Sequence, residues 1–164
     1  MLSFYWVNGT QTLYKESIAM KTLKPYERSV FYYETDKMSI VHHSNYVRIF
    51  GEARIDLLRQ LGFPLETVEK DGASLHTISV HSEFKRPLVF AEPFAVYTVI
   101  TNVNEETFEI GYRIVSRKTG QISVTGNSVQ CFAGNELNPI TLSDVSEALS
   151  VRLKEYIGCE ASDN

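Results

Sequence analysis

The chain has 164 residues, of which 43% are hydrophobic and 22% charged, and its formal net charge is -4. This length and composition fit one globular domain with a sizeable core. The acidic balance argues against a nucleic-acid-binding surface, which normally needs a basic face. No apolar run approaches the roughly 20 residues that a helix needs to cross a bilayer, so we expect no membrane span.

The chain divides into three parts. We interpret residues 1–24 as an N-terminal extension without clear strand or helix patterns, and residues 25–157 as the domain. Met20 opens a stretch that is typical of a domain start, so one hypothesis is that the native chain begins there, and the alternative is that residues 1–19 are a loosely attached arm. The polar tail, residues 158–164, is expected to fray.

A strand followed by a long helix opens the domain. Arg28–Tyr33 is rich in β-branched and aromatic residues and is predicted to be a strand. From Tyr46 to Leu61, apolar and polar side chains recur at spacings of three and four, which predicts a helix. Ser44 or Asn45 is its expected N-cap, and Gly62 ends it.

Two charged residues of this helix carry specific expectations. Glu52 lies on a polar stripe and is expected to pair with Arg48 or Asp56, because residues three or four apart are neighbours on a helix. Arg54 projects on the apolar side. We expect it to be paired with a polar group or to extend its guanidinium to solvent.

The second half of the chain is dominated by strands. Four long strands are predicted in antiparallel succession, with hairpin-like turns between the last three: His76–Phe84, Glu92–Val103, Glu106–Arg117 and Gln121–Ala133. Helical spacing resumes from Thr141 to Ile157, with Ser143 as a possible cap. One long helix against a wide antiparallel sheet predicts the α+β class.

A single acid, Asp36, precedes the first helix by a short loop. The first N–H groups of a helix have no intrahelical partner and favour negative charge nearby. They can also stabilise the oxyanion that forms when a carbonyl is attacked. Asp36 lies seven residues before His43, so the loop can fold back beside the helix start. The alternative interpretation is an ordinary loop or capping acid.

The stretch YYETDKMSIVHHSNYVRIFGEAR, residues 32–54, resembles the 4-hydroxybenzoyl-CoA thioesterase family of hotdog-fold acyl-CoA thioesterases. Asp36 falls on the position of the family's catalytic acid. The segments that follow match the family patterns V-V-x-H-x-N-Y and F-x-E-A-R. A second stretch, SEFKRPLVFAEPF, also fits, and the resemblance covers about residues 26–133.

The resemblance implies a fold, an assembly and a reaction. The fold is a hotdog, a long central helix wrapped by an antiparallel sheet. The assembly is a homodimer or homotetramer with the active site between subunits. The reaction is hydrolysis of an acyl-CoA to the free acid and CoA, without a cofactor, because CoA is part of the substrate. The identity of the acyl group stays open.

The resemblance also gives roles to particular residues. Asp36 is the nucleophile or the general base, and the His43 backbone N–H polarises the thioester carbonyl. The expected substrate-binding residues are Ser44, Tyr46, Phe50, Lys85 and Arg86. The last two are candidates for the phosphates of CoA. Arg117 and Lys118 are alternatives for that role, and solvated turn charges are the plainer interpretation of all four.

Three departures from the family pattern affect the site. The family usually has glycine near the positions of Met38 and Ser39, so the loop is bulkier here and its path is expected to differ. His42 replaces a tyrosine or phenylalanine. Gly51, and not a second acid, precedes the glutamate of the F-x-E-A-R pattern. None of these changes removes Asp36.

Other chemistries are less well supported. Metal sites need ligands that converge at fixed spacings, and the histidines show none, so we expect no metal. Cys131 and Cys159 have no paired spacing and are expected to be reduced thiols in a cytoplasmic protein. Two alternatives stay open: hydrolysis of acyl groups on an acyl carrier protein, and a hotdog module that binds acyl-CoA without turnover.

Overall fold

The computed structural model describes residues 3–7, 10–14, 22–69, 72–134 and 137–163. Within the N-terminal extension, β1 (Ser3–Val7) and β2 (Thr10–Tyr14) pair as an antiparallel hairpin. The expectation that the extension has no regular structure is therefore wrong for these two segments. Met20, the hypothetical native start, lies outside the described residues. Leu23 is 3% exposed and belongs to the core of the domain.

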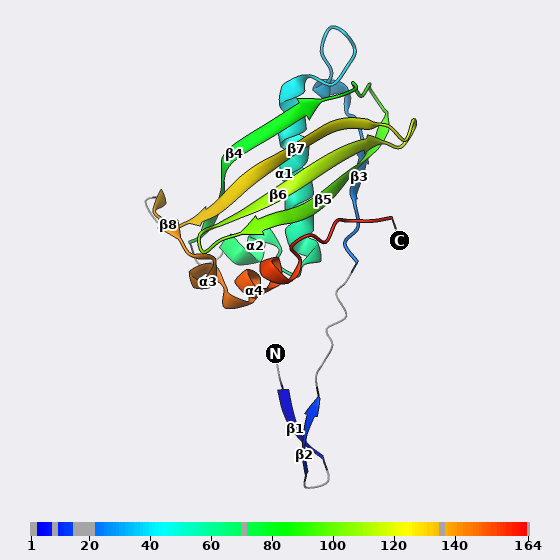
Figure 1. Cartoon of the computed structure of the whole chain (residues 1–164). Helices are drawn as coiled ribbons and strands as arrows, with labels where there is room; N and C mark the ends of the chain where they lie inside the picture. The colour runs from blue at the N-terminus through cyan, green and yellow to red at the C-terminus, as the bar shows by residue number, and fades with distance from the viewer. Residues whose placement is uncertain (1–2, 8–9, 15–21, 70–71, 135–136, 164) are drawn as a thin grey trace.

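The domain is built on one curved antiparallel sheet (Figure 1). Its strand order is β3-β5-β6-β7-β4, and a short strand, β8, also pairs with β7. The bounds are β3 (Tyr26–Ser29), β4 (Ser74–Phe84), β5 (Pro93–Val103), β6 (Thr107–Ser116), β7 (Ile122–Ala133) and β8 (Pro139–Ile140). The two hairpins β5–β6 and β6–β7 are confirmed. The predicted simple succession is wrong at its first step, because β4 pairs with β7 and not with β5.

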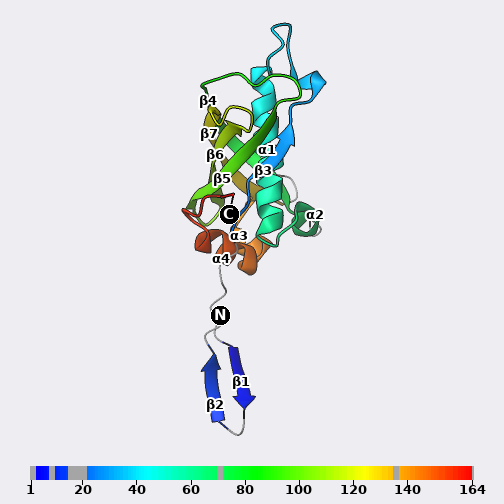
Figure 2. The same cartoon turned by 90° about the vertical axis from the view of Figure 1, so that its right-hand side faces the viewer.

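The long helix α1 (His43–Gln60) lies against one face of the sheet, as a separate layer in Figure 2. Its buried side chains recur at helical spacing and form one apolar face: Tyr46, Ile49, Phe50, Ala53, Leu57 and Leu58. They pack into a single core with the inward side chains of β5, β6 and β7. The predicted α+β class is confirmed, and the helix begins three residues earlier than predicted.

The strand predicted for Arg28–Tyr33 is shorter than expected. β3 ends at Ser29, and Tyr32–Glu34 forms a turn of 3-10 helix, η1. The cause is local, because the Glu34 carboxylate accepts a hydrogen bond of 2.8 Å from the Phe31 backbone N–H. This bond curls the chain away from the sheet edge and towards the start of α1.

The other helices are short. α2 (Leu65–Val68) follows α1, and the predicted helix Thr141–Ile157 is two helices, α3 (Leu142–Val145) and α4 (Glu147–Glu155). Ser146 between them is extended, with φ −169° and ψ 119°, and its side chain caps α4. Thr141 caps α3, so Ser143 is not the cap. None of the described helices is both long and apolar enough to cross a membrane.

The C-terminal tail is docked, and the expectation that it frays is wrong. Three of its backbone N–H groups donate to carbonyls of the domain: Gly158 to Ile100, Ala161 to Thr98 and Ser162 to Leu23. The tail thus continues along β5 where its partner β3 has ended, because an open strand edge offers unpaired carbonyls.

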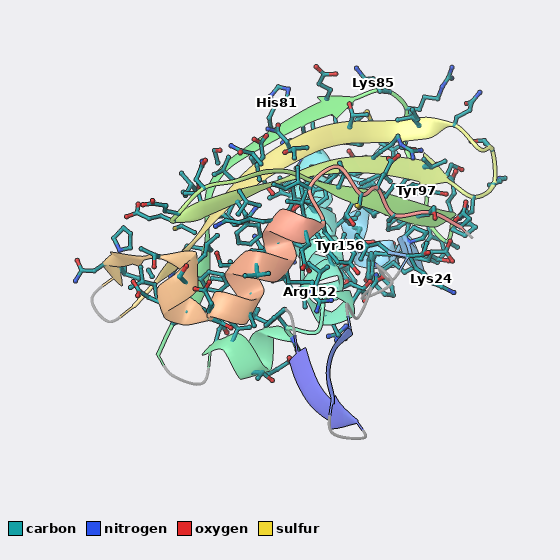
Figure 3. The ribbon with its side chains drawn as sticks, turned by 60° about the horizontal axis from the view of Figure 1, so that its bottom comes forward. Lys24, His81, Lys85, Tyr97, Arg152 and Tyr156 are labelled. Atoms are coloured by element: carbon teal, nitrogen blue, oxygen red, sulfur yellow. The ribbon has the colours of Figure 1, made fainter. Side chains whose placement is uncertain are left out.

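Side chains reinforce this attachment. The carboxylate of Asp163 accepts hydrogen bonds from Arg117 and from the Tyr97 hydroxyl, past which the tail runs in Figure 3. The hydrogen bond from Arg117, and to a smaller extent that from Tyr97, lowers the pKa of Asp163 to about 2. Arg117 also pairs with Glu27 on β3, so it ties the β6–β7 turn to both the tail and the sheet edge.

A chain that stops after Ile157 tests this attachment. We expect its free energy of unfolding in urea to fall by about 2–3 kcal/mol, because three backbone hydrogen bonds are lost. The variant Glu160→Gln keeps the backbone and should change it by less than about 0.5 kcal/mol. Equal stability of the shortened and full chains would show that the tail is not held.

Candidate active site

A pocket of about 340 Å³ opens at the N-terminal end of α1. Three segments form its walls: the loop before the helix with Asp36, the first turn with His43 and Tyr46, and the segment after β4 with Lys85 and Arg86. The remaining wall is mostly apolar and comes from Met38, Ile40, Val41, Phe84 and Pro87. The structure therefore brings five of the seven expected site residues to one place.

The loop that carries Asp36 is a tight turn. The Asp36 N–H donates to the Ile40 carbonyl and the Ser39 N–H to the Asp36 carbonyl, each at 2.9 Å. Oδ1 of Asp36 accepts a bond of 2.7 Å from the Met38 N–H. Ser39 has φ 61°, the left-handed conformation that glycine adopts without strain. A left-handed turn therefore forms here although the residue is serine.

The helix start is capped differently from the expectation. His42 is the N-cap, and its Nδ1 accepts from the Ser44 N–H at 3.4 Å. Ser44 and Asn45 are not caps, since both lie within the first turn, and the Asn45 amide donates to the Glu34 carbonyl at 2.8 Å. His43 is the first helical residue, so its N–H precedes the intrahelical hydrogen bonds.

A buried ion pair lies next to the loop that carries Asp36, on the side away from the pocket. The Arg28 guanidinium donates two hydrogen bonds to the carboxylate of Glu34, whose exposed fraction is 2%. Burial by itself raises the pKa of Glu34, but hydrogen bonds from Arg28 and the Phe31 N–H outweigh it and hold this pKa below its usual value. Arg28 also binds Glu52 at 2.7 Å, so the expected pairing of Glu52 within α1 is wrong.

Tyr46 joins the helix to the third wall of the pocket. Its hydroxyl accepts a hydrogen bond of 3.3 Å from the Leu88 N–H, and its ring lies 5.6 Å from that of Phe84. Burial raises the pKa of Tyr46, so its hydroxyl stays protonated at neutral pH. Tyr46 thus fixes the segment after β4 against the first turn of α1.

Two expected site residues lie outside the pocket. Ser44 is exposed on the first turn, beside His42. Phe50 is 2% exposed and stacks on Tyr112 with ring centroids 4.3 Å apart. It borders a separate cavity of about 70 Å³ with Arg54. The structure therefore does not bring these two side chains to Asp36.

Arg54 is a paired arginine, one of the two expected outcomes. Its Nη1 donates to Thr77 and to Gln130, at 2.6 Å each. Burial lowers the pKa of Arg54. These bonds connect the middle of α1 to β4 and β7, so the side chain holds the helix on the sheet.

The candidate cations near the pocket differ in the acidic partners that they already bind. Lys85 projects to solvent, as Figure 3 shows, and pairs with Glu83 at 2.5 Å. Arg86 lines the pocket and also an adjoining one of about 270 Å³, which Lys118 borders as well. Arg117, an alternative for phosphate binding, is instead held by Glu27 and Asp163. Arg86 and Lys118 are therefore the better placed of the four for an anionic ligand.

The residues that could bind a metal do not converge. Among the described residues, no group of three or more His, Cys, Asp and Glu side chains could hold a metal ion. Cys131 and Cys159 are free thiols. The rings of His42 and His43 are tilted by 36° with centroids 4.1 Å apart, which is a ring contact and not a ligand pair.

Sequence reasoning missed the roles of Arg28 and Glu34. Glu34 lies two residues before Asp36, but no spacing rule links it to an arginine six residues upstream in a predicted strand. The signal that was available is an acid in an otherwise aromatic run, Phe31–Glu34, where a buried carboxylate needs a partner.

Ser39→Gly tests the strain in the Asp36 loop. A non-glycine residue in the left-handed conformation costs about 1 kcal/mol. Glycine removes this strain, but it also raises the entropy of the unfolded chain, which offsets part of the stabilisation. We expect the free energy of unfolding to rise by about 0.5 kcal/mol, measured in urea. A fall of more than about 1 kcal/mol would show that Ser39 is not strained.

Comparisons with known proteins agree with this architecture. Residues 30–153 match the model of the thioesterase-like superfamily. YneP of Bacillus subtilis (strain 168), which carries a provisional name as an acyl-CoA thioesterase, is 32% identical over 115 residues, 70% of this chain and 83% of that protein. A DHNA-CoA thioesterase from Staphylococcus aureus is 25% identical with a TM-score of 0.78, covering 80% of this chain and 89% of that one.

A hypothetical protein from Aquifex aeolicus is also similar in structure. It is 32% identical with a TM-score of 0.68, and the match covers 76% of this chain and 98% of that one. The family match covers α1, strands β4 to β8 and the residues that line the pocket, and the TM-scores show that the two solved structures share this fold. The chain belongs to the thioesterase-like superfamily and has the hotdog fold.

Proposed function

We propose that the protein hydrolyses the thioester of an acyl-CoA to the free acid and CoA. One observation carries this proposal: Asp36 and His43, the first residue of α1, line the same pocket. A carboxylate and a helix start at one place are the groups that an attack on an activated acyl carbon needs. Relatives with acyl-CoA thioesterase names support the choice of substrate.

The helix start is the proposed oxyanion site. The Ser44 N–H donates to the His42 ring, whereas the His43 N–H has no partner among the described residues, and His43 lines the pocket. A thioester carbonyl that accepts from this N–H is polarised by the hydrogen bond and by the helix dipole. Both effects strengthen as negative charge develops on the carbonyl oxygen, so they favour the transition state over the substrate.

Asp36 is the proposed nucleophile, with general-base catalysis as the alternative. Oδ1 accepts from the Met38 N–H, which leaves Oδ2 without a donor among the residues that the structure describes. In the nucleophilic route, Oδ2 attacks the acyl carbon, the C–S bond breaks, and CoA leaves as a thiolate that takes a proton from water. Water then hydrolyses the mixed anhydride. As a base, Asp36 removes a proton from the attacking water.

Tyr46 and Arg86 are the proposed substrate-binding residues, and Lys85, which lines the same pocket but pairs with Glu83, is a secondary candidate. Tyr46 shapes the pocket beside the acyl carbon, and Arg86 stands where the pocket meets its neighbour. Because CoA carries phosphates, a guanidinium at this mouth provides a geometric match for them. Ser44 and Phe50 lie outside the pocket, and we assign neither of them a contact.

Finer assignments extend this proposal. An aryl-CoA substrate, as in the 4-hydroxybenzoyl-CoA family, fits the sequence motif, and the relative from Staphylococcus aureus is named for another aryl-CoA. We also propose a homodimer or homotetramer, on the basis of the motif. The two free thiols favour a cytoplasmic location. Thiol release from a panel of acyl-CoAs identifies the acyl group.

Asp36→Asn is the most direct test of the catalytic role. We expect kcat to fall by about 100-fold or more, because an amide neither attacks nor accepts a proton. CoA binding, measured by calorimetry, should stay within about twofold. Asp144→Asn, at an exposed acid on α3, is the matched control and should keep full activity. Full activity of Asp36→Asn would remove Asp36 from the mechanism.

A single turnover in oxygen-labelled water separates the two routes. Recovery of label in the Asp36 carboxylate indicates a nucleophile, whereas label only in the product acid on the first turnover indicates general-base catalysis.

Arg86→Gln tests the phosphate contact. We expect KM for acyl-CoA to rise about 5- to 10-fold with little change in kcat, because a contact to the remote part of the substrate is made equally in the ground and transition states. The rise should shrink at high salt. Arg59→Gln, at the opposite end of α1, serves as the control. An unchanged KM would assign the phosphates to other residues.

A further inference from the structure

The segment that carries Asp36 is held on one side by a two-pronged ion pair. Nη1 and Nη2 of Arg28, on β3, donate to the two carboxylate oxygens of Glu34 at 2.9 and 2.6 Å. The side chains are 11% and 2% exposed, so water competes little for these bonds. Paired hydrogen bonds of this kind fix orientation as well as distance.

The same residue holds the helix start on its other side. The backbone carbonyl of Glu34 accepts two hydrogen bonds, from the His42 N–H at 2.9 Å and from the Asn45 amide at 2.8 Å. A carbonyl has two lone pairs, and both are used here. Glu34 therefore connects β3, through its side chain, to the first turn of α1, through its backbone.

We propose that Glu34, clamped by Arg28, is the positioning residue that sets Asp36 against the first N–H groups of α1. This inference rests on the proposed function and adds to it a residue that contacts no substrate. Glu34 does not line the pocket. It acts through Asp36, two residues later, and through His42, the residue before the proposed oxyanion donor.

The geometry leaves the loop little freedom once Glu34 is held. Thr35 and Val41 form an antiparallel bridge, and the Asp36 N–H bonds to the Ile40 carbonyl. Asp36 thus sits at the base of a closed loop, which the bonds at Glu34 hold on the side of the helix start and the pairing of Ile40 and Val41 with Val89 and Leu88 holds on the other. A displacement of about 1 Å between reacting groups can cost about 100-fold in rate.

The Arg28–Glu34 ion pair, called the clamp below, requires the shape of the arginine side chain. Its Nε donates to Glu52 on α1 while its two Nη atoms hold Glu34. The two Nη bonds that hold Glu34 are separate from the Nε bond to Glu52, so Glu52 can be changed without breaking them. Lysine carries the same charge but lacks this fork, so it cannot replace the arginine here.

The test compares two substitutions on the two partners of Arg28. Glu34→Gln keeps the side-chain shape but removes the charge that the fork binds, so we expect kcat to fall at least about 10-fold with KM within about twofold. Glu52→Gln makes the same change on the partner away from Asp36 and should leave kcat within about twofold. Arg28→Lys should reproduce the kcat loss of Glu34→Gln.

Stability is measured alongside, because a buried charge pair also supports the fold. Each variant is assayed well below its own melting temperature, with CoA binding as a check that the pocket is intact. If Glu34→Gln does not fold, Asn45→Ala replaces it. That variant removes one bond to the Glu34 carbonyl, keeps the ion pair, and should lower kcat at least about 3-fold at unchanged KM.

The outcomes separate this inference from the function on which it rests. A kcat loss in Glu34→Gln or Asn45→Ala without a loss in Glu52→Gln supports the clamp. Folded Glu34→Gln with wild-type kcat, or equal losses in Glu34→Gln and Glu52→Gln, overturns it while thioester hydrolysis stands. A wild-type chain that hydrolyses no acyl-CoA overturns both.

Discussion

The first turn of α1 has backbone N–H groups that the helix itself cannot satisfy, and the arrangement of the site follows from how each is used. The His42 N–H goes to the Glu34 carbonyl and the Ser44 N–H to the His42 ring. What remains is the N–H of His43, a residue that lines the same pocket as Asp36. Partial positive charge at a helix start stabilises a carboxylate and a developing oxyanion alike. The helix start thus serves both groups of the proposed reaction.

The periodic and local features of the chain were predictable from the sequence. The apolar spacing of α1 predicted the helix, and β-branched runs predicted β4 to β7, because these patterns arise where one face of an element is buried in the core. Asp36 and His43 share a pocket, as their separation by a short loop before a helix indicated. The family motif added the choice of chemistry, which spacing by itself does not supply.

The features that were not predictable are those made between distant segments. Arg28 reaches Glu52 across 24 residues, whereas helical spacing suggested partners one turn away. β4 pairs with β7, a strand far along the chain, and no local pattern encodes that order. The polar tail docks because the edge of β5 is open beyond β3. Sequence composition predicted fraying there, since it carries no information about an unpaired edge.

Thioester hydrolysis at this pocket requires that Asp36 and the start of α1 face the same acyl carbon. A crystal structure with a non-hydrolysable acyl-CoA analogue, whose carbonyl is retained, tests it most directly. We expect an Asp36 carboxylate oxygen about 3–3.5 Å from the acyl carbon, with the His43 N–H donating to the carbonyl oxygen. A carbonyl bound away from both groups, in the same subunit and across any subunit boundary, would contradict it.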